Sequence, residues 1–301
     1  MNGLLRQGSP KFNGSMTALI TPFENGELDI KSFEKIVNFQ IDNGTNGLIP
    51  VGTTGESPTL SHYEHEKIVE ECIKVADNRV PIIAGAGSNS TQEACKLAKH
   101  AAKAGAQAVL VVTPYYNKPT QDGLYSHFMA VADAAKIPII VYDIPGRSII
   151  PVHDKTLVKL CENNELIAGI KDATADISRP PRLLRLIGSG FSQLSGEDAT
   201  ALPYLAAGGH GCISVSSNIV PHLLSEMHNA WINGDMNGAF KIHLKLINLH
   251  DAMFCESSPG PVKFAAEKIG LCKSEARLPI VKIAESSAQQ VLYALKECEL
   301  I

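Results

Sequence analysis

The sequence lacks the features that mark several large classes of protein. It has no run of about 20 apolar residues, the length that a membrane-spanning helix requires. Residues 1–14 are polar and glycine-rich, and they predict no secretory signal. Basic residues are not in excess, since 27 Lys and Arg stand against 31 Asp and Glu. We therefore expect no nucleic-acid partner and no membrane partner.

The cysteines are scattered and show no metal-site spacing. The seven cysteines form no CxxC pair. We expect neither a disulfide framework nor a zinc site, and a reducing cytoplasm is the expected location. Each cysteine is interpreted as a small buried apolar residue. They are Cys72, Cys95, Cys161, Cys212, Cys255, Cys272 and Cys298.

The sequence does contain a repeated alternation of short apolar runs with amphipathic stretches. The runs are rich in Val, Ile or Leu, or lie between Gly and Pro, as is typical of buried parallel strands. Eight such units in roughly 220 residues predict an α/β fold of the (β/α)8 TIM-barrel class. The expected strands are residues 16–22, 47–51, 81–86, 108–113, 138–143, 167–172, 193–196 and 211–216. The expected helices are residues 30–43, 61–76, 91–104, 121–135, 154–162, 177–187, 199–207 and 220–231.

A doubly wound open sheet is the alternative fold. It usually has fewer units, and it often carries a glycine-rich nucleotide loop after its first strand. Here the first expected strand leads into Thr21-Pro22-Phe23, with no GxGxxG motif. We therefore expect one catalytic barrel over residues 12–234. A helical C-terminal extension is expected over residues 235–301, interrupted at residues 259–261.

Catalytic groups of such a barrel lie at the C-terminal ends of its strands. Lys171, within the sixth expected strand, is the most informative of them. A lysine in an apolar strand must pair with an anion or lose its proton. On this residue alone an internal ion pair, or a surface lysine that extends its amine to solvent, is the simpler interpretation. The alternative is a neutral amine that attacks a ketone to form an imine.

The turn at residues 52–57 favours the second interpretation. It reads GTTGES and joins an expected strand to an expected helix. Its small residues leave backbone N–H groups open near a helix N-terminus, which is a place where a carboxylate or phosphate binds. An ordinary βα turn is the alternative. Thr53 and Thr54, between two glycines, favour an anion site.

Tyr142 and Arg147 follow the fifth expected strand. A buried tyrosine is usually a core residue with a satisfied hydroxyl group, but here the phenol could move protons during imine chemistry. A phenol needs partners to do so at neutral pH, and Thr54 and Tyr116 could supply them. Arg147 is either a surface ion-pair residue or a clamp on a substrate carboxylate.

Two other polar segments are interpreted as non-catalytic. His62 and His65 share one face at a helix start, but no third ligand is in view, so we rank a metal site below a surface or binding role. Residues 208–211 precede the eighth strand, where we expect a tight turn and not a phosphate loop.

Six motifs along the chain become specific when taken together. They are GTTGES (52–57), YYNKPTQDGLYSHF (115–128), YDIPGR (142–147), GIKDAT (169–174), SGED (195–198) and PGPVKFA (259–265). As a set they resemble the dihydrodipicolinate synthase (4-hydroxy-tetrahydrodipicolinate synthase) family, within the superfamily of pyruvate-dependent class I aldolases and N-acetylneuraminate lyase. The resemblance runs over residues 12–301, although any single motif would be weak.

The resemblance implies a condensation of pyruvate with L-aspartate 4-semialdehyde, on the diaminopimelate route of lysine biosynthesis. It implies no metal and no organic cofactor. Lys171 matches the lysine that forms the imine. Tyr142 matches the tyrosine that moves protons, and Thr54 and Tyr116 match the other members of its relay.

The resemblance also implies roles in substrate binding. Thr53 and Thr54 match the residues that hold the pyruvate carboxylate. Arg147 matches the arginine that serves the carboxylate of the aldehyde substrate. Gly196 and Ile213 match residues that line the pyruvate pocket.

Assembly and regulation are implied as well. The family is typically a homotetramer built from two tight dimers, in which Tyr116 would reach into the site of a neighbouring subunit. Feedback inhibition by L-lysine is implied by a full set of matching positions. They are Ser57, His62, His65, Asn89, Glu93 and Tyr115. The sequence departs from many members at Asp143 and Ser148, where Asn and Thr are common.

Three alternatives remain. An N-acetylneuraminate lyase or a 2-keto-3-deoxy-sugar acid aldolase would share the lysine, the tyrosine and the anion turn, but Arg147 suits a short carboxylated aldehyde better than a polyol. A non-catalytic barrel that senses pyruvate or lysine is an alternative of another class. A phosphate-binding barrel enzyme is weaker, because the loops after the seventh and eighth strands lack a glycine-rich anion site.

Overall fold

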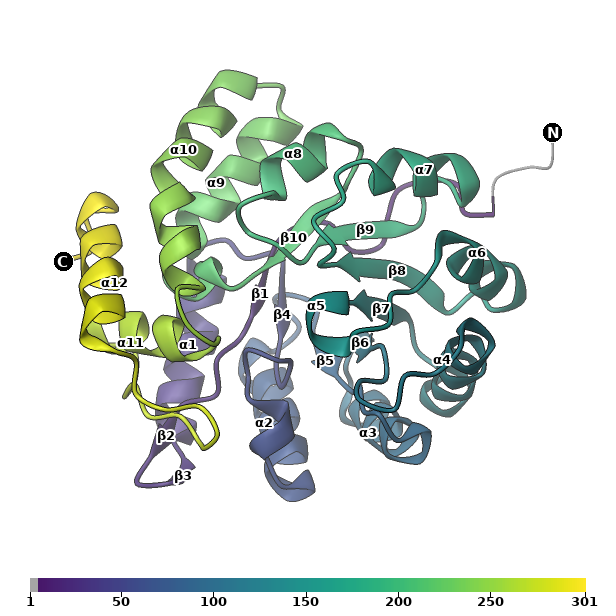
Figure 1. The fold of residues 1–301 in the computed structure, drawn as a ribbon, viewed down its shortest axis with the longest axis horizontal. Helices are drawn as coiled ribbons and strands as arrows, with labels where there is room; N and C mark the ends of the chain where they lie inside the picture. The colour runs from purple at the N-terminus through teal and green to yellow at the C-terminus, as the bar shows by residue number, and fades with distance from the viewer. Residues whose placement is uncertain (1–4) are drawn as a thin grey trace. The chain divides into compact units, whose positions relative to one another are not determined.

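The computed structural model describes residues 5–301. Residues 1–4, part of the start for which no secretory signal is expected, lie outside the described residues. In the described part of the chain, eight parallel strands alternate with helices, and three helices follow the last of these units (Figure 1). The predicted fold class, a (β/α)8 barrel with a helical C-terminal extension, is confirmed.

The described chain forms two compact units. One comprises Ile83–Ile213 together with the N-terminal segment as far as Gly14, and the other comprises Ser15–Ile82 with Ser214–Ile301. The boundary that we expect between residues 234 and 235 stays a prediction. No helix among the described residues is long and apolar enough to cross a membrane.

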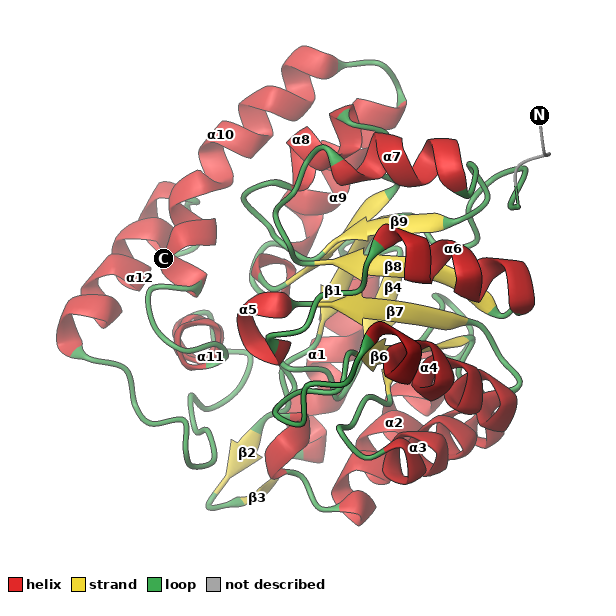
Figure 2. Cartoon of the chain, turned by 45° about the vertical axis from the view of Figure 1, so that its right-hand side comes forward, coloured by secondary structure: helices red, strands yellow, loops and turns green. Residues whose placement is uncertain are grey.

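The first unit is built on parallel strands hydrogen-bonded in the order β10-β9-β8-β7-β6-β5. Their Val- and Ile-rich runs are almost wholly buried, because helices cover the sheet. Helices α4, α6 and α7 lie along one face of these strands (Figure 2). The strands are β5 (Ile83–Gly85), β6 (Ala108–Val112), β7 (Ile139–Asp143), β8 (Ile167–Asp172), β9 (Ser192–Ser195) and β10 (Gly211–Ser214). The helices are α3 (Thr91–Ala104), α4 (Gln121–Ala135), α5 (Pro145–Ser148), α6 (Asp154–Asn163), α7 (Arg179–Leu186) and α8 (Ala201–Ala206).

The second unit contains the first two strands of the alternation and the C-terminal helices. β1 and β4 pair in parallel, and a two-stranded antiparallel hairpin, β2–β3, which the sequence pattern did not predict, follows β1. Helices α10, α11 and α12 contact one another (Figure 1). The strands are β1 (Gly14–Ala18), β2 (Phe23–Glu24), β3 (Glu27–Leu28) and β4 (Gly47–Ile49). The helices are α1 (Ile30–Asp42), η1 (Ser57–Thr59), α2 (His62–Ala76), η2 (Ser216–Asn218), α9 (Pro221–Ile232), α10 (Met236–Met253), α11 (Gly260–Lys268) and α12 (Glu285–Glu297).

Helix ends follow local chemistry closely. Ser61 and Glu64 form a reciprocal capping box at the start of α2. Ser90 accepts a hydrogen bond from the Glu93 N–H at the start of α3, and Gly105 ends that helix in the left-handed conformation. These side chains make local contacts, so the predicted helix boundaries agree with the structure to within two residues.

Strand ends agree less well, and β1 shows why. The apolar pattern predicts a strand over residues 16–22, whereas β1 ends at Ala18. Leu19 and Ile20 remain buried, but the Ile20 N–H donates to the Asn218 side chain and not to a neighbouring strand. An apolar sequence pattern predicts that residues are buried. It does not predict which acceptor a backbone N–H group binds, so it does not give the end of a strand.

Candidate active site

Lys171 and Tyr142 lie side by side on neighbouring strands. The parallel register of β7 and β8 pairs Tyr142 directly with Lys171. Both side chains are about 5% exposed, and Lys171 Nζ lies 4.4 Å from the centroid of the Tyr142 ring. The Lys171 amine therefore lies over the face of the Tyr142 ring. Two residues singled out in the sequence are thus brought together.

The next residue on each strand is an aspartate, and the two share one arginine. Successive side chains of a strand point to opposite faces, so Asp143 and Asp172 face away from Tyr142 and Lys171. Arg179, at the start of α7, donates from Nη1 to Asp143 Oδ2 at 2.7 Å, and the same nitrogen lies 3.6 Å from Asp172 Oδ1. All three side chains are buried.

Further contacts hold Arg179 in place. Its Nε donates to Asp154 Oδ1 at 3.0 Å, and its Nη2 donates to the Val152 carbonyl at 2.6 Å. Burial raises the pKa of Asp143, and the positive charge of Arg179 opposes that rise. This cluster was not predicted from the sequence. The available signal was the acidic residue that directly follows both Tyr142 and Lys171.

Glu197 feels the charges of both Lys171 and Arg147. Arg147 is exposed and lies in the single-turn helix α5, which follows β7. Burial and the Asp198 charge raise the pKa of Glu197, whereas the positive charges of Lys171 and Arg147 oppose this shift. The charges of Lys171 and Arg147 therefore both act on Glu197, a residue that the sequence analysis did not single out.

Gly196 and Ile213 are placed by the strands that precede or contain them. The Gly196 N–H donates to the Asp172 carbonyl at 2.7 Å. A Cβ atom there would lie 2.8 Å from the Ala173 Cβ, so a larger residue would displace the segment that follows Lys171. Ile213 is fully buried in β10. Their proposed contact with pyruvate stays a prediction.

The GTTGES turn (residues 52–57) belongs to the second unit. Its internal hydrogen bonds reduce the number of N–H groups that could bind an anion. The N–H groups of Gly55, Glu56 and Ser57 donate to carbonyl groups inside the turn. Within the described chain, the N–H and hydroxyl groups of Thr53 and Thr54 have no protein partner. The two threonines, and not the whole turn, therefore offer donors to a ligand.

Tyr116 is placed quite differently from the other candidates. Its side chain is 86% exposed, and its φ of 72° lies in the left-handed region, which is unusual for a bulky residue. It is not part of the Lys171–Tyr142 pair in a single chain. Such an exposed, strained aromatic side chain is typical of a functional position.

The six positions expected to bind lysine fall in two groups. In the first unit, burial and the Glu93 charge raise the pKa of Tyr115, and a backbone hydrogen bond at Asn89 opposes the shift, so these three residues are neighbours. In the second unit, Ser57 starts η1, His62 starts α2 and is exposed, and His65 is buried one turn later. That these six residues bind lysine stays a prediction.

A model of the Dihydrodipicolinate synthetase family matches residues 11–298 of the chain. The chain belongs to this family. It is 57% identical over 291 residues to the 4-hydroxy-tetrahydrodipicolinate synthase of Bradyrhizobium diazoefficiens, a match that covers 97% of this chain and 98% of that protein. It is 54% identical over 291 residues to the protein of the same name from Afipia carboxidovorans, with 97% and 98% covered.

Solved structures of dihydrodipicolinate synthases match the whole fold. The chloride-inhibited enzyme of Acinetobacter baumannii complexed with pyruvate matches with a TM-score of 0.93 and 44% identity, covering 97% of this chain and all of that one. The Cyanidioschyzon merolae enzyme with lysine bound gives 0.94 and 36%, with 97% and 100% covered. A monomeric variant gives 0.94 and 42%, with 96% and 98% covered. The family resemblance found in the sequence is confirmed.

The structure also describes the two segments that the sequence suggests are non-catalytic, His62 with His65 and residues 208–211. Among the described residues, no group of three or more His, Cys, Asp or Glu side chains could hold a metal ion. Gly208 has a φ of 99° and lies in a turn before β10. A Cβ atom on Gly209 would lie 2.2 Å from the Tyr204 ring, so this turn needs glycine for packing.

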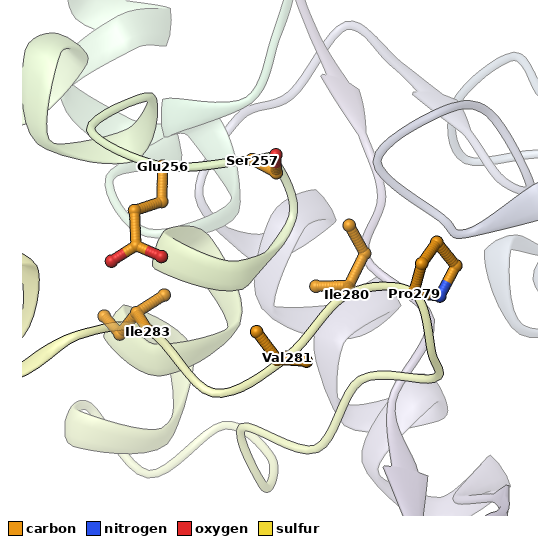
Figure 3. A pocket seen from close by; sticks show the side chains of 6 residues that line it. All are labelled: Glu256, Ser257, Pro279, Ile280, Val281 and Ile283. Carbon is orange, nitrogen blue, oxygen red and sulfur yellow. The ribbon is translucent and has the colours of Figure 1, made fainter.

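Two cavities open at the surface of the described residues. One, of about 500 Å³, is lined by residues of α6 and α7, including Arg179. The other, of about 340 Å³, is lined by Glu256 and Ser257 and by the segment that precedes α12 (Figure 3). Neither is lined by Lys171 or Tyr142.

Proposed function

We propose that the chain is a 4-hydroxy-tetrahydrodipicolinate synthase, a lyase that condenses pyruvate with L-aspartate 4-semialdehyde through an imine on Lys171. The observation that carries the proposal is the buried Lys171 amine at the C-terminal end of β8, in contact with the Tyr142 ring. Membership of the family and the names of its 54–57% identical relatives support the choice of substrates.

The chemistry follows from a neutral amine and an α-keto acid. The Lys171 amine attacks the ketone carbon of pyruvate, and the carbinolamine loses water to give an imine. The imine withdraws electrons, so a methyl proton leaves and an enamine forms. The enamine carbon attacks the aldehyde carbon of the second substrate. The amino group of that adduct then attacks the imine carbon, which closes the ring and releases Lys171 as an amine.

Every one of these steps moves a proton, and none calls for a cofactor. We assign the proton transfers to Tyr142, whose ring already contacts the Lys171 amine. Thr54 and Tyr116 complete the relay that the family resemblance implies. Thr53 and Thr54 hold the pyruvate carboxylate with their unpartnered donors, and Arg147 holds the carboxylate of the aldehyde.

A second copy of the chain completes the site in this proposal. Tyr116 is 86% exposed, so it is available to a neighbouring subunit. We propose a homotetramer made of two tight dimers, working in the cytoplasm. The monomeric variant among the solved structures shows that the fold itself does not require this assembly.

We also propose that L-lysine is a feedback inhibitor of this enzyme. The residues are those of the two local groups described above, and a structurally similar enzyme has lysine bound. The side chain of Glu93 offers a carboxylate that can accept from an ammonium group of lysine, and Tyr115 offers a phenol that can donate to its carboxylate.

The proposal is tested by trapping the imine. Pyruvate and borohydride should add one reduced adduct per chain, and peptide mass spectrometry should locate it on Lys171. The Lys171→Met variant should give no adduct. An adduct at another lysine, or none in the native protein, would refute the Schiff-base assignment.

Turnover separates the proposed function from its alternatives. With pyruvate present, the enzyme should consume L-aspartate 4-semialdehyde and leave N-acetylmannosamine unchanged. The reverse preference would identify a sugar-acid aldolase. An adduct without turnover of either aldehyde would favour a sensing protein.

A further inference from the structure

The unit that carries the GTTGES turn also contains a buried ion pair that the mechanism above does not use. Lys263, in α11, is fully buried and donates from Nζ to Glu56 Oε1 at 2.6 Å. The same ammonium group lies 4.3 Å from the centroid of the Phe23 ring. Glu56 is itself buried and belongs to the turn. The pair therefore joins the C-terminal extension to the turn directly.

Net stability is a poor explanation for this pair. Removing two charges from water costs several kcal/mol per ion, and apolar residues of similar volume are often at least as stable. Burial lowers the pKa of Lys263, and the Glu56 carboxylate opposes that shift. The attraction between Lys263 and Glu56 does little more than offset the cost of burying the two charges. The conformation that the pair fixes in the turn is therefore the better explanation for it.

The geometry that it imposes is that of a strained turn. Glu56 has a φ of 56° and Val51 a φ of 50°, both in the left-handed region that disfavours side chains. Such conformations persist only where the surrounding contacts determine them. Both carboxylate oxygens of Glu56 are engaged, since Oε1 accepts from Lys263 and Oε2 accepts from the Arg277 N–H at 2.9 Å.

Arg277 extends the same hold to the residues that follow the turn. Its Nη1 donates to the Thr59 carbonyl at 3.0 Å, and its guanidinium group hydrogen-bonds the Glu64 carboxylate at the start of α2. The guanidinium carbon lies 4.4 Å from the centroid of the Phe23 ring. Lys263 and Arg277 of the extension therefore both bind Glu56 near the end of the turn. Arg277 also binds the start of the helix that follows.

We propose that Glu56 and Lys263 are positioning residues, through which the C-terminal extension holds Thr53 and Thr54 in the conformation that binds the pyruvate carboxylate. The inference rests on the proposed function, which assigns that carboxylate to the turn. Neither residue touches substrate in this account. Loss of the pair should therefore weaken pyruvate binding and leave the imine chemistry on Lys171 intact.

The test compares pyruvate binding with chemistry in variants that avoid an unpaired buried charge. The double variant Glu56→Gln, Lys263→Met removes both charges and keeps an acceptor for the Arg277 N–H. Half-maximal borohydride-trapped adduct should require at least about tenfold more pyruvate than in the native enzyme, the effect of losing one charge-assisted contact. At saturating pyruvate, deuterium exchange into the pyruvate methyl group should stay within about twofold of native.

Two further variants make the result specific. Lys268→Met removes an exposed lysine from the same helix, and it should bind pyruvate as the native enzyme does. The single variant Glu56→Gln is isosteric and keeps Lys263, whose amine can lose its proton once the carboxylate is gone. It is a second readout if the double variant fails to fold, and it should show the same weakened binding.

Three results would overturn the inference. They are native pyruvate affinity in both Glu56 variants, an equal loss in the Lys268 control, and a fall in methyl exchange at saturation as large as the fall in affinity. Failure of the proposed function is distinct, because then the native protein itself forms no pyruvate adduct on Lys171.

Discussion

At the scale of single residues, charge near the candidate site is arranged on two faces of the same two strands. Lys171 and Tyr142 occupy one face, and Asp143 and Asp172 the other, where Arg179 meets them. When both are ionised, the buried carboxylates of Asp143 and Asp172 carry one more negative charge than Arg179 can balance. Asp143 Oδ1 and Asp172 Oδ2 are buried, and neither atom has a hydrogen-bond partner among the described residues. Burial therefore outweighs the arginine at Asp143, as the raised pKa indicates.

The Asp143→Asn variant tests this balance. A pKa raised in the folded state means that ionisation of Asp143 costs stability as pH rises above the unfolded-state value near 4. The variant should unfold with a free energy equal to native, or up to about 1 kcal/mol higher, at pH 8, and its relative advantage should shrink toward pH 4. Urea unfolding across this pH range measures it. A loss of several kcal/mol at pH 8 would show instead that the bond to Arg179 dominates.

At the scale of elements, the start of α2 concentrates several hydrogen bonds on one carboxylate. Glu64 accepts from the Ser61 N–H and hydroxyl groups and from the Arg277 guanidinium group. The Arg277 hydrogen bond is the main cause that lowers the pKa of Glu64 from 4.5 to about 2. Arg277, which belongs to the C-terminal extension, therefore binds the start of α2 through this carboxylate.

The Glu64→Gln variant should therefore show a pH-dependent loss. A carboxylate whose folded-state pKa is lowered stabilises the protein above its unfolded-state value and loses that contribution as pH falls through about 2. Native protein should exceed the variant in free energy of unfolding by a constant amount above about pH 5, and the gap should close between about pH 4.5 and pH 2. Denaturant titrations at each pH provide the measurement.

The control is Ser90→Ala at the start of α3. It removes a cap of about 1 kcal/mol, and its effect should not follow this pH curve. A gap for Glu64→Gln that is independent of pH would contradict the assigned charge effect.

At the scale of the whole molecule, the exposure of Tyr116 makes assembly part of the proposed chemistry. A residue that is 86% exposed in one chain can serve a second chain without rearrangement of the core. An isologous dimer would exchange this tyrosine in both directions, because each subunit presents the same surface to the other.

Subunit complementation tests the exchange. Lys171→Met and Tyr116→Phe variants should each be nearly inactive alone. After subunit exchange, half of the dimers pair one variant with the other, and one site in each such dimer has both native residues. Activity should therefore recover to about a quarter of native. Recovery that stays at the sum of the two variants would place Tyr116 in its own subunit's site or outside the reaction.

The sequence by itself determined the order of elements and most of the candidate residues. Periodicity, helix caps and turn residues act over a few positions, so helix starts such as Ser61 and strand runs such as 167–172 could be predicted from the sequence alone. The positions of Lys171, Tyr142, Thr54 and Arg147 could be predicted because catalytic groups follow strand ends, and the motifs made the set specific. Their individual roles stay predictions.

The tertiary structure alone decided which distant charges meet. Glu56 and Lys263 are 207 positions apart, and Asp143 and Arg179 are 36 apart. No local periodicity links such pairs, since their contact depends on how helices pack on the sheet. The same packing decided where β1 stops pairing and which donors of the GTTGES turn remain open. Local spacing thus determined the helices and strands. The packing of residues far apart in the sequence decided which buried ion pairs form around the candidate site.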